Sequence, residues 1–260
     1  MQIIVCIKQV PETTEVKINL QTNTLIREGV KSIINPFDMY AIEEAIRLKE
    51  KFGGKTIVIT MGPPQAEEAL REALSMGIDE AILITDRAFA GSDTWATSYT
   101  LSLAIKKIAK FDIILCGKQA SDGDTAQVGP GIAGHLDIPQ VTFVKKIEKI
   151  ENGTCQVQRM TEEGYEIISV SLPVLLTVVK EINEPRLPSL KGMLRAKKQE
   201  VIRWNAKDLG ADSALIGLEG SPTRVIKVFH PPVRTGGIIL RGDTEETTEK
   251  LVELLKEHLR

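Results

Sequence analysis

The chain has few of the features that mark secreted, membrane-spanning or metal-binding proteins. Its 260 residues include three cysteines, Cys6, Cys116 and Cys155, which lie far apart. An odd number without close spacing predicts neither a disulfide framework nor a metal site, and it suits a reducing compartment. No apolar run approaches the roughly 20 residues that a membrane helix needs, and no secretory leader is expected in a chain that starts with a strand pattern. We therefore expect a cytoplasmic protein with no membrane partner.

An excess of charge of one sign is also missing. Lys and Arg number 33 and Asp and Glu 35, which gives a formal net charge of -2. A nucleic-acid-binding surface needs a positive excess to displace phosphate counterions, so no nucleic-acid partner is expected. The sequence contains no G-x-S-x-G elbow and no H-E-x-x-H pair, which are common anchors of hydrolase and metal chemistry. We expect no catalytic side chain and no metal, so that any redox chemistry would need a bound cofactor.

Short apolar runs alternate with helical patterns over the first half of the chain. Runs rich in Ile and Val predict buried strands at 3–8, 56–60, 81–85 and 112–117. Helical patterns separate them, such as the one from Asn35 to Gly53, where Asn35 is a candidate N-cap with Asp38 at the reciprocal position. This alternation predicts an α/β fold with a doubly wound, mostly parallel sheet.

The second half has a different pattern. Apolar runs at 141–150, 154–160 and 165–172, joined by tight-turn residues, predict an antiparallel β extension. We expect one region at 1–200 and a second at 201–260, which is irregular and ends in a helical arm. The arm opens on Asp243-x-x-Glu246, a capping-box pattern, and its apolar stripe packs either on a partner or on the chain's own core. The stripe consists of Leu251, Val252, Leu254, Leu255 and Leu259.

Ligands of a doubly wound sheet bind beyond the carboxyl ends of its strands. After the strand at 112–117 the chain enters the Gly-rich stretch 118–134, which leads into a helix with Asp124 or Thr125 as the predicted cap. Free N–H groups at such a helix start suit a phosphate or pyrophosphate. Asp122 would repel phosphate, and so would Asp124, so both are expected to cap the helix or to hold a ribose hydroxyl. The alternative is that the glycines serve tight helix–sheet packing.

The loop at 86–97 offers a second candidate anion site. It also leads into a predicted helix, with Asp93 as N-cap. Ser and Asp residues are ordinary caps, so a purely structural role is the alternative here.

Several segments carry a resemblance to a known family. Residues 157–177, VQRMTEEGYEIISVSLPVLLT, resemble the signature segment of electron transfer flavoprotein beta subunits. NPFDMYAIEEAIRLKE, MGPPQAEEALREALSMG, LCGKQASDGDTAQVGPGIAGHL and NEPRLPSL agree with the family in the same order. The resemblance spans roughly residues 1–200.

The resemblance implies an adenine-nucleotide-binding α/β domain that pairs with an FAD-carrying alpha subunit, which the C-terminal arm contacts. It places the nucleotide on a set of residues near the strand ends: Cys6, Asn35, Pro36, Phe37, Asp38, Met61, Asp122, Gly123, Asp124, Thr125, Ala126, Gln127, Val128, Gly129, Pro130, Gly131, Ile132 and Ala133. Simple members hold AMP there, whereas electron-bifurcating members hold a second FAD.

The forms DGDTAQVGP and DRAFAGSDTWATS are similar to the bifurcating group, in which Asp93, Thr94 and Thr97 would help to bind the second flavin. That group takes a hydride from NADH. It sends one electron through the alpha subunit to an acyl-CoA dehydrogenase-type or 2-hydroxy-acid dehydrogenase flavoprotein, and the other to ferredoxin or flavodoxin. AMP with simple electron shuttling is the alternative. The loop at 183–194 resembles the family's partner-recognition loop, with Leu190 as a lone apolar anchor, and an ordinary mobile loop is the alternative.

Overall fold

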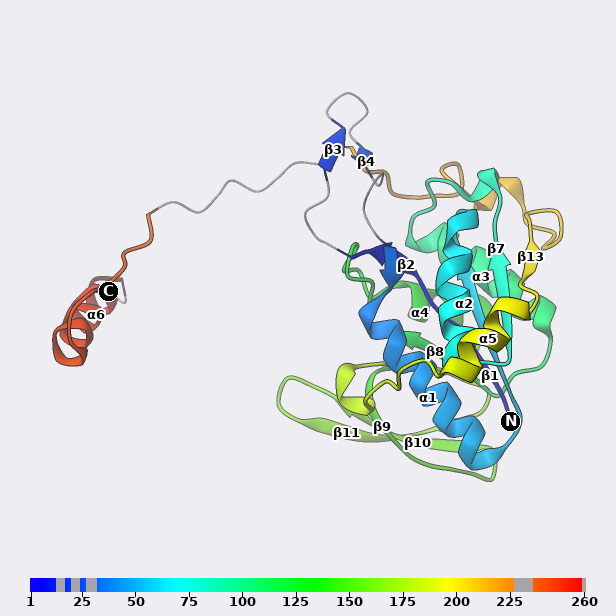
Figure 1. Cartoon of the computed structure of the whole chain (residues 1–260), viewed down its shortest axis with the longest axis horizontal. Helices are drawn as coiled ribbons and strands as arrows, with labels where there is room; N and C mark the ends of the chain where they lie inside the picture. Colours follow the sequence, from blue (N-terminus) through cyan, green and yellow to red (C-terminus); the bar gives the residue numbers. More distant parts are fainter. Residues whose placement is uncertain (13–16, 20–23, 27–31, 227–235, 259–260) are drawn as a thin grey trace. The chain divides into compact units, whose positions relative to one another are not determined.

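The computed structural model of the protein describes residues 1–12, 17–19, 24–26, 32–226 and 236–258 (Figure 1). The chain divides into two compact units, Met1–Ile226 and Lys227–Arg260. The first unit contains the central sheet and the helices that cover it, and the second contains the C-terminal helix.

The centre of the first unit is a nine-stranded sheet in the order β11-β10-β9-β12-β8-β1-β6-β7-β13. Its strands are β1 (Gln2–Cys6), β6 (Lys55–Met61), β7 (Glu80–Ile84), β8 (Ile113–Gly117), β9 (Gln140–Glu151), β10 (Thr154–Met160), β11 (Tyr165–Ser171), β12 (Val174–Val178) and β13 (Ile202–Trp204). The strands from β12 to β13 pair in parallel, and β12 is also parallel to the start of β9. The β9–β10 and β10–β11 pairs are antiparallel. This arrangement confirms the predicted fold class.

Helices cover both faces of the sheet because alternate strand residues point to opposite sides. On one face Ile3, Val5 and Val58 pack with α1 (Pro36–Phe52) and α2 (Glu67–Met76). On the other, Ile4, Cys6 and Ile57 pack with α3 (Thr94–Ile108) and α4 (Val128–Leu136). The chain runs from β1 to β6 and β7 on one side and then crosses to β8 on the other. The switch point predicted for a ligand therefore lies between β1 and β8.

Smaller elements complete the first unit. Two short antiparallel pairs, β2 (Gln9–Pro11) with β5 (Ser32–Ile34) and β3 (Lys17–Asn19) with β4 (Thr24–Ile26), follow β1 in the chain. Single turns of 3-10 helix lie at η1 (Pro64–Ala66), η2 (Arg87–Phe89), η3 (Lys180–Ile182) and η4 (Ser213–Leu215).

Helix α5 (Leu190–Lys198) lies beside α2 (Figure 1). The Arg195 guanidinium donates to the carbonyls of Leu74 and Ile78 at the end of α2, at 2.8 and 2.9 Å. Arg71 of α2 in turn donates to the Ala196 carbonyl at 2.8 Å. Each helix thus receives a cation close to its C-terminal end, which is the favourable end for a positive charge.

Residues 201–226, which the sequence analysis grouped with the C-terminal arm, lie in the first unit. The reason is that β13 extends the parallel sheet by pairing with β7, with Trp204 opposite Ile84. The second unit holds α6 (Thr244–His258), whose start is capped as predicted, because Asp243 Oδ1 accepts hydrogen bonds from the backbone N–H groups of Glu245 and Glu246. In the described residues no helix is long and apolar enough to cross a membrane.

Candidate functional site

Asp38 lies at the switch point, where β1 and β8 end side by side with Cys6 opposite Cys116. Its Oδ2 accepts from the backbone N–H of Lys8 at 2.7 Å, and its Oδ1 accepts from the N–H of Gly117 at 3.2 Å. The carboxyl is buried, and this burial raises its pKa to about 7 against the opposing effect of its hydrogen bonds. A Cβ on Gly117 would lie 2.3 Å from Asp38 Oδ1, so the glycine makes this close approach possible.

Asn35 joins Asp38 to the loop after β8. Its Nδ2 donates to Asp38 Oδ1 at 3.0 Å and to the Gln119 carbonyl at 2.8 Å, while its Oδ1 accepts from the Ser121 N–H at 3.0 Å. The predicted reciprocal cap is therefore wrong: Asn35 makes no side-chain cap of α1, because its amide bonds to the neighbouring loop instead. Pro36 opens α1, and the ring of Phe37 lies 5.8 Å from Lys118 Nζ.

The loop at 118–127 lies over these strand ends and is mostly exposed. Lys8 Nζ holds it through an ion pair of 2.6 Å with Asp122, and Gln119 donates to Asp124. Asp124 and Ala126 have φ of 54° and 55°, in the left-handed region, where non-glycine residues are uncommon and often functional. A Cβ on Gly123 would meet nothing within 4 Å, so space is open beside that backbone.

The helix after this loop starts later than predicted. Its N-cap is Gln127, which makes no side-chain hydrogen bond to the helix, so the predicted cap by Asp124 or Thr125 is wrong. Both residues precede Gln127 in a stretch that is not yet helical, where Asp124 and Ala126 have left-handed φ. The start of α4 is therefore free of a side-chain cap, which is the condition under which N–H groups suit an anion.

Two of the three glycines of α4 serve tight packing, which was the alternative interpretation of this stretch. A Cβ on Gly129 would lie 2.7 Å from Thr177 Cγ2, and one on Gly131 would lie 2.6 Å from Ser98 Oγ. Gly129 therefore lets α4 approach β12, and Gly131 lets it approach α3. Ile132 and Ala133 are buried in the same layer, while Val128 and Pro130 are half-buried. Gly123, in contrast, serves no packing contact.

Asp93 caps α3 as predicted. Its Oδ1 accepts from the N–H groups of Trp95 and Ala96, and its Oδ2 accepts from the N–H and hydroxyl of Thr223. Burial opposes ionisation, but these hydrogen bonds outweigh it and hold the pKa of Asp93 below its usual range. Thr94 Oγ1 donates to Gln127 Oε1 at 2.9 Å, which joins the starts of α3 and α4. The half-buried Thr97 lies one turn further along α3.

Two residues that the sequence analysis did not select lie close to these helix starts and strand ends. Trp95 is about half exposed, and its ring centroid lies 4.6 Å from that of His135 on α4. Lys118 Nζ lies within 5.8 Å of the rings of Phe37 and Phe143. Both lie in segments that resemble the family, but their ring contacts join segments that are distant in sequence.

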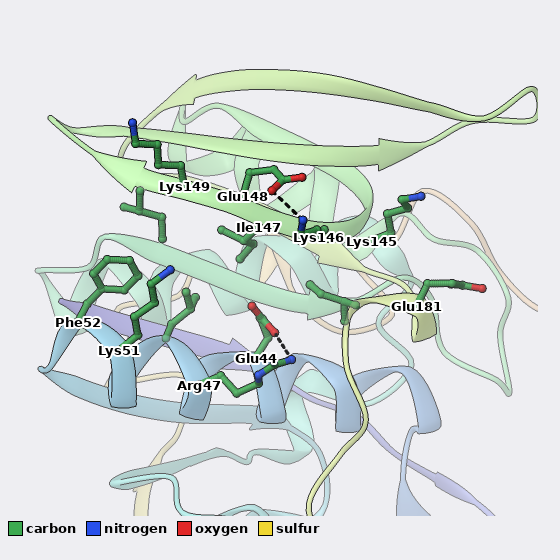
Figure 2. A pocket seen from close by; sticks show the side chains of 13 residues that line it. Glu44, Arg47, Lys51, Phe52, Lys145, Lys146, Ile147, Glu148, Lys149 and Glu181 are labelled. Carbon is green, nitrogen blue, oxygen red and sulfur yellow. Dashed lines mark ion pairs between the residues drawn. The ribbon is translucent and has the colours of Figure 1, made fainter.

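A cavity of about 330 Å³ lies away from this site, between the second half of α1 and β9 (Figure 2). Because α1 starts at the carboxyl edge of the sheet, the segment from Glu44 to Phe52 lies toward the opposite edge. Glu44 is buried and pairs with Arg47 on α1, while Glu148 pairs with Lys146 on β9, on the other side of the cavity. The cavity therefore does not coincide with the predicted nucleotide residues.

The segment before α5 is fixed to α1. Arg186 forms ion pairs with Glu43 at 2.8 Å and Glu50 at 2.6 Å, and Asn183 Nδ2 donates to the Tyr40 carbonyl at 3.0 Å. Leu190 is the first residue of α5 and is 72% exposed. It is not a lone apolar side chain, because Leu187, Met193 and Leu194 are exposed as well. They form a small apolar surface on a supported segment.

Comparison with known proteins identifies the family. The electron transfer flavoprotein domain matches residues 22–209. The chain belongs to the electron transfer flavoprotein beta subunits. It is 58% identical to the electron transfer flavoprotein subunit beta of Thermoanaerobacterium thermosaccharolyticum over 98% of both chains. It is 53% identical to the caffeyl-CoA reductase-Etf complex subunit CarD of Acetobacterium woodii, over 99% of this chain and 98% of that one. The protein FixA of Bradyrhizobium diazoefficiens is 45% identical, over 98% and 91%.

Membership of this family establishes a role in electron transfer alongside an alpha subunit. Among the described residues no cluster of His, Cys, Asp or Glu has the arrangement of a metal site. The matched segment includes the end of β8, the loop at 118–127 and the surface around Leu190, whereas β1 precedes it.

Proposed function

We propose that this beta subunit binds FAD at the β1–β8 switch point and is where NADH delivers its electrons. The observation that carries the proposal is the uncapped start of α4 below an exposed glycine loop, at the sheet edge where doubly wound proteins bind nucleotides. Bound FAD would supply the hydride-accepting chemistry. One electron would leave through the alpha-subunit FAD to an acyl-CoA or 2-hydroxy-acid dehydrogenase, and the other would go to ferredoxin or flavodoxin.

The residues present fit such a group. The N–H groups at the start of α4 would hold the pyrophosphate, and the open space beside Gly123 leaves the backbone accessible to it. Thr94 and Thr97 lie in the first turn of α3, beside the start of α4, where the other end of an extended dinucleotide would bind. Asp93 acts through its cap of α3, because both of its carboxylate oxygens are engaged within the protein. We place the complex in the cytoplasm.

The relatives support the bifurcating version of the function. CarD carries a name that joins a caffeyl-CoA reductase with an Etf complex, so a close relative works with a CoA-linked partner. AMP remains the alternative ligand, because an uncapped helix start suits a single phosphate equally well. With AMP the subunit would bind no second flavin, and the heterodimer would only relay electrons.

Counting the cofactors of the purified heterodimer separates these two versions. We expect two FAD per heterodimer and bleaching of the flavin absorbance on addition of NADH. One FAD with one AMP would refute bifurcation. Replacing Thr97 with Ala is expected to lower the beta-subunit flavin content while the alpha-subunit flavin stays bound. A matched control is Ser102→Ala on the same helix, whose hydroxyl bonds to the Tyr99 carbonyl.

We also propose that the surface formed by Leu187, Leu190, Met193 and Leu194 docks the dehydrogenase. Small apolar anchors surrounded by charge are typical of interface hot spots, and Lys191, Lys197 and Lys198 supply the charge. Leu190→Ala is expected to weaken electron transfer to the dehydrogenase about tenfold, an apolar truncation cost of roughly 1–2 kcal/mol. NADH oxidation by artificial acceptors should not change. Equal loss of both activities would contradict a docking role.

A further inference from the structure

Every side-chain nitrogen and oxygen atom of Asn35 and Asp38 has a hydrogen-bond partner within the protein. Both Nδ2 hydrogens of Asn35 are used, on Asp38 and on the Gln119 carbonyl. Its Oδ1 accepts from the Ser121 N–H, and the Asp38 oxygens accept from three donors, two of them backbone N–H groups. These residues were expected to bind the nucleotide because they belong to a resembling motif. In the structure their side chains bind the protein itself.

The pair connects three segments that meet at the site. Asp38 joins the residue two positions after β1 to the last residue of β8 through Lys8 and Gly117. Asn35 then holds the following loop at Gln119 and Ser121, and Lys8 extends the connection to Asp122 with its ammonium group. The exposed part of the loop, around Gly123, is thus anchored on one side by these hydrogen bonds.

We propose that Asn35 and Asp38 are positioning residues that hold the loop at 118–124 in its ligand-binding form, and that they act in the ionised state of Asp38. The inference rests on the proposed nucleotide site. The two N–H donors from Lys8 and Gly117 require an acceptor on each carboxyl oxygen, and a protonated Asp38 would turn one acceptor into a donor. Protonation therefore releases one strand end from the other and loosens the loop.

The charges around Asp38 agree with this role. Lys8 is the cation whose charge favours the ionised form of Asp38, and the Cys116 thiol lies close to Asp38 on β8. The carboxylate of Asp122 is paired with the Lys8 ammonium. Lys118 lies on the ring of Phe37, the residue before Asp38. Burial raises the pKa of Asp38 to about 7, so the ionisation falls in a range that a binding experiment can reach. A bound ligand that needs the ordered loop would favour the ionised form.

The test is a titration of FAD into the heterodimer that retains its alpha-subunit flavin, between pH 6 and 8. FAD is the suitable probe because its pyrophosphate has no ionisation near neutrality, whereas the AMP monoester titrates at about 6. We expect the wild-type dissociation constant to increase as the pH falls below about 7, by up to about tenfold per pH unit. Asp38→Asn should bind FAD at least about tenfold more weakly at pH 8 and show no such slope, since an amide cannot accept from both N–H groups.

Glu44→Gln is the matched control. Glu44 is a buried carboxyl of the same helix whose pKa is also raised by burial, but it bonds to Asn183 and Arg47 on the side of the cavity. Glu44→Gln should keep the wild-type pH dependence of the FAD dissociation constant. If the effect of Asp38→Asn came only from a destabilised α1, Glu44→Gln would change that pH dependence as well. Asn35→Ala is expected to weaken FAD binding at every pH, and it supplies a second variant if Asp38→Asn does not fold.

A wild-type affinity that is constant between pH 6 and 8, or an Asp38→Asn variant with wild-type affinity and slope, would overturn the positioning role. That outcome differs from failure of the proposed function, in which the wild-type heterodimer would take up no second FAD at any pH.

Discussion

Two glycines of α4 differ in what surrounds them, although both lie in the same helix. A side chain at Gly131 would press into Ser98 of α3, with its Cβ 2.6 Å from the hydroxyl oxygen, whereas a Cβ at Gly134 would meet nothing within 4 Å. Overpacking at such a contact typically costs about 1–3 kcal/mol. Removing glycine from a free helix position typically stabilises by about 0.5–1 kcal/mol.

We therefore expect Gly131→Ala to lower the free energy of unfolding by about 1–3 kcal/mol and Gly134→Ala to raise it slightly. Urea denaturation followed by circular dichroism measures both. If the two variants changed stability equally, the close approach of α3 and α4 at Gly131 would be refuted.

At the scale of elements, one arginine fixes the docking segment to α1. Arg186 bonds to Glu43, which is buried, and to Glu50, which is exposed. Hydrogen bonds from Arg186 are the main cause that lowers the pKa of Glu50. An exposed ion pair of this kind contributes little, because solvent screens it, whereas a buried carboxylate without its partner is costly.

Arg186→Ala is expected to destabilise the chain by about 1–3 kcal/mol, because Glu43 is left buried and unpaired. It should also reduce dehydrogenase coupling by loosening the segment that carries Leu187 and Leu190. Glu50→Gln is the control and should change stability by less than about 0.5 kcal/mol. Thermal unfolding and dehydrogenase assays on both variants check this, and equal effects would contradict the dominant role of Glu43.

At the scale of the whole molecule, the free energy of unfolding depends on pH in opposite ways for a carboxyl whose pKa is raised by burial and for one whose pKa is lowered by hydrogen bonds. Asp38 binds a proton more tightly in the folded state, where burial raises its pKa to about 7 from the ordinary value of 3.8. Its contribution is therefore fully present at low pH and is lost as the pH rises through about 7. For Asp79, burial is outweighed by hydrogen bonds from Lys49 and Thr56, which hold its pKa below the usual range. The contribution of Asp79 to the free energy of unfolding is therefore lost as the pH falls below about 4.

We expect the free energy of unfolding to be highest near about pH 4 and to decrease as the pH rises to about 7, by at most about 4 kcal/mol from Asp38. Denaturant titrations of the ligand-free chain across this range measure it. Asp38→Asn should flatten the decrease between about pH 4 and 7. A wild-type stability that increased over that range would contradict the assignment.

The second unit provides a separate test of assembly. Leu251, Val252 and Leu255 of α6 are between 42% and 49% exposed, which leaves an apolar stripe available to a partner. We expect a chain that ends at Ile226 to unfold with nearly the same free energy but to lose its affinity for the alpha subunit. Size-exclusion chromatography of the co-expressed subunits checks this. A stable heterodimer without α6 would show that the arm is dispensable.

Much of the fold could be predicted from local pattern. Continuous Ile and Val runs predict buried parallel strands, because a strand that is covered by helices on both faces of the sheet needs apolar side chains on both sides. Helical spacing located α1 and α3, and Asp93 and Asp243 were recognisable caps because a cap depends on neighbouring N–H groups alone. The position of the candidate site followed from the order of strands, since parallel strands end at one edge.

Contacts between distant segments could not be predicted in the same way. Asn35 has the residue type of a cap, yet its amide bonds to Gln119 and Ser121, which the fold brings beside it. Helix α4 begins at Val128 because left-handed residues delay it, and residues 201–226 join the sheet through β13. Local propensity determines which element forms, but a polar side chain bonds to whichever donors or acceptors the packed chain places nearest. The partners of Asn35 and Asp38 are therefore a property of the tertiary structure.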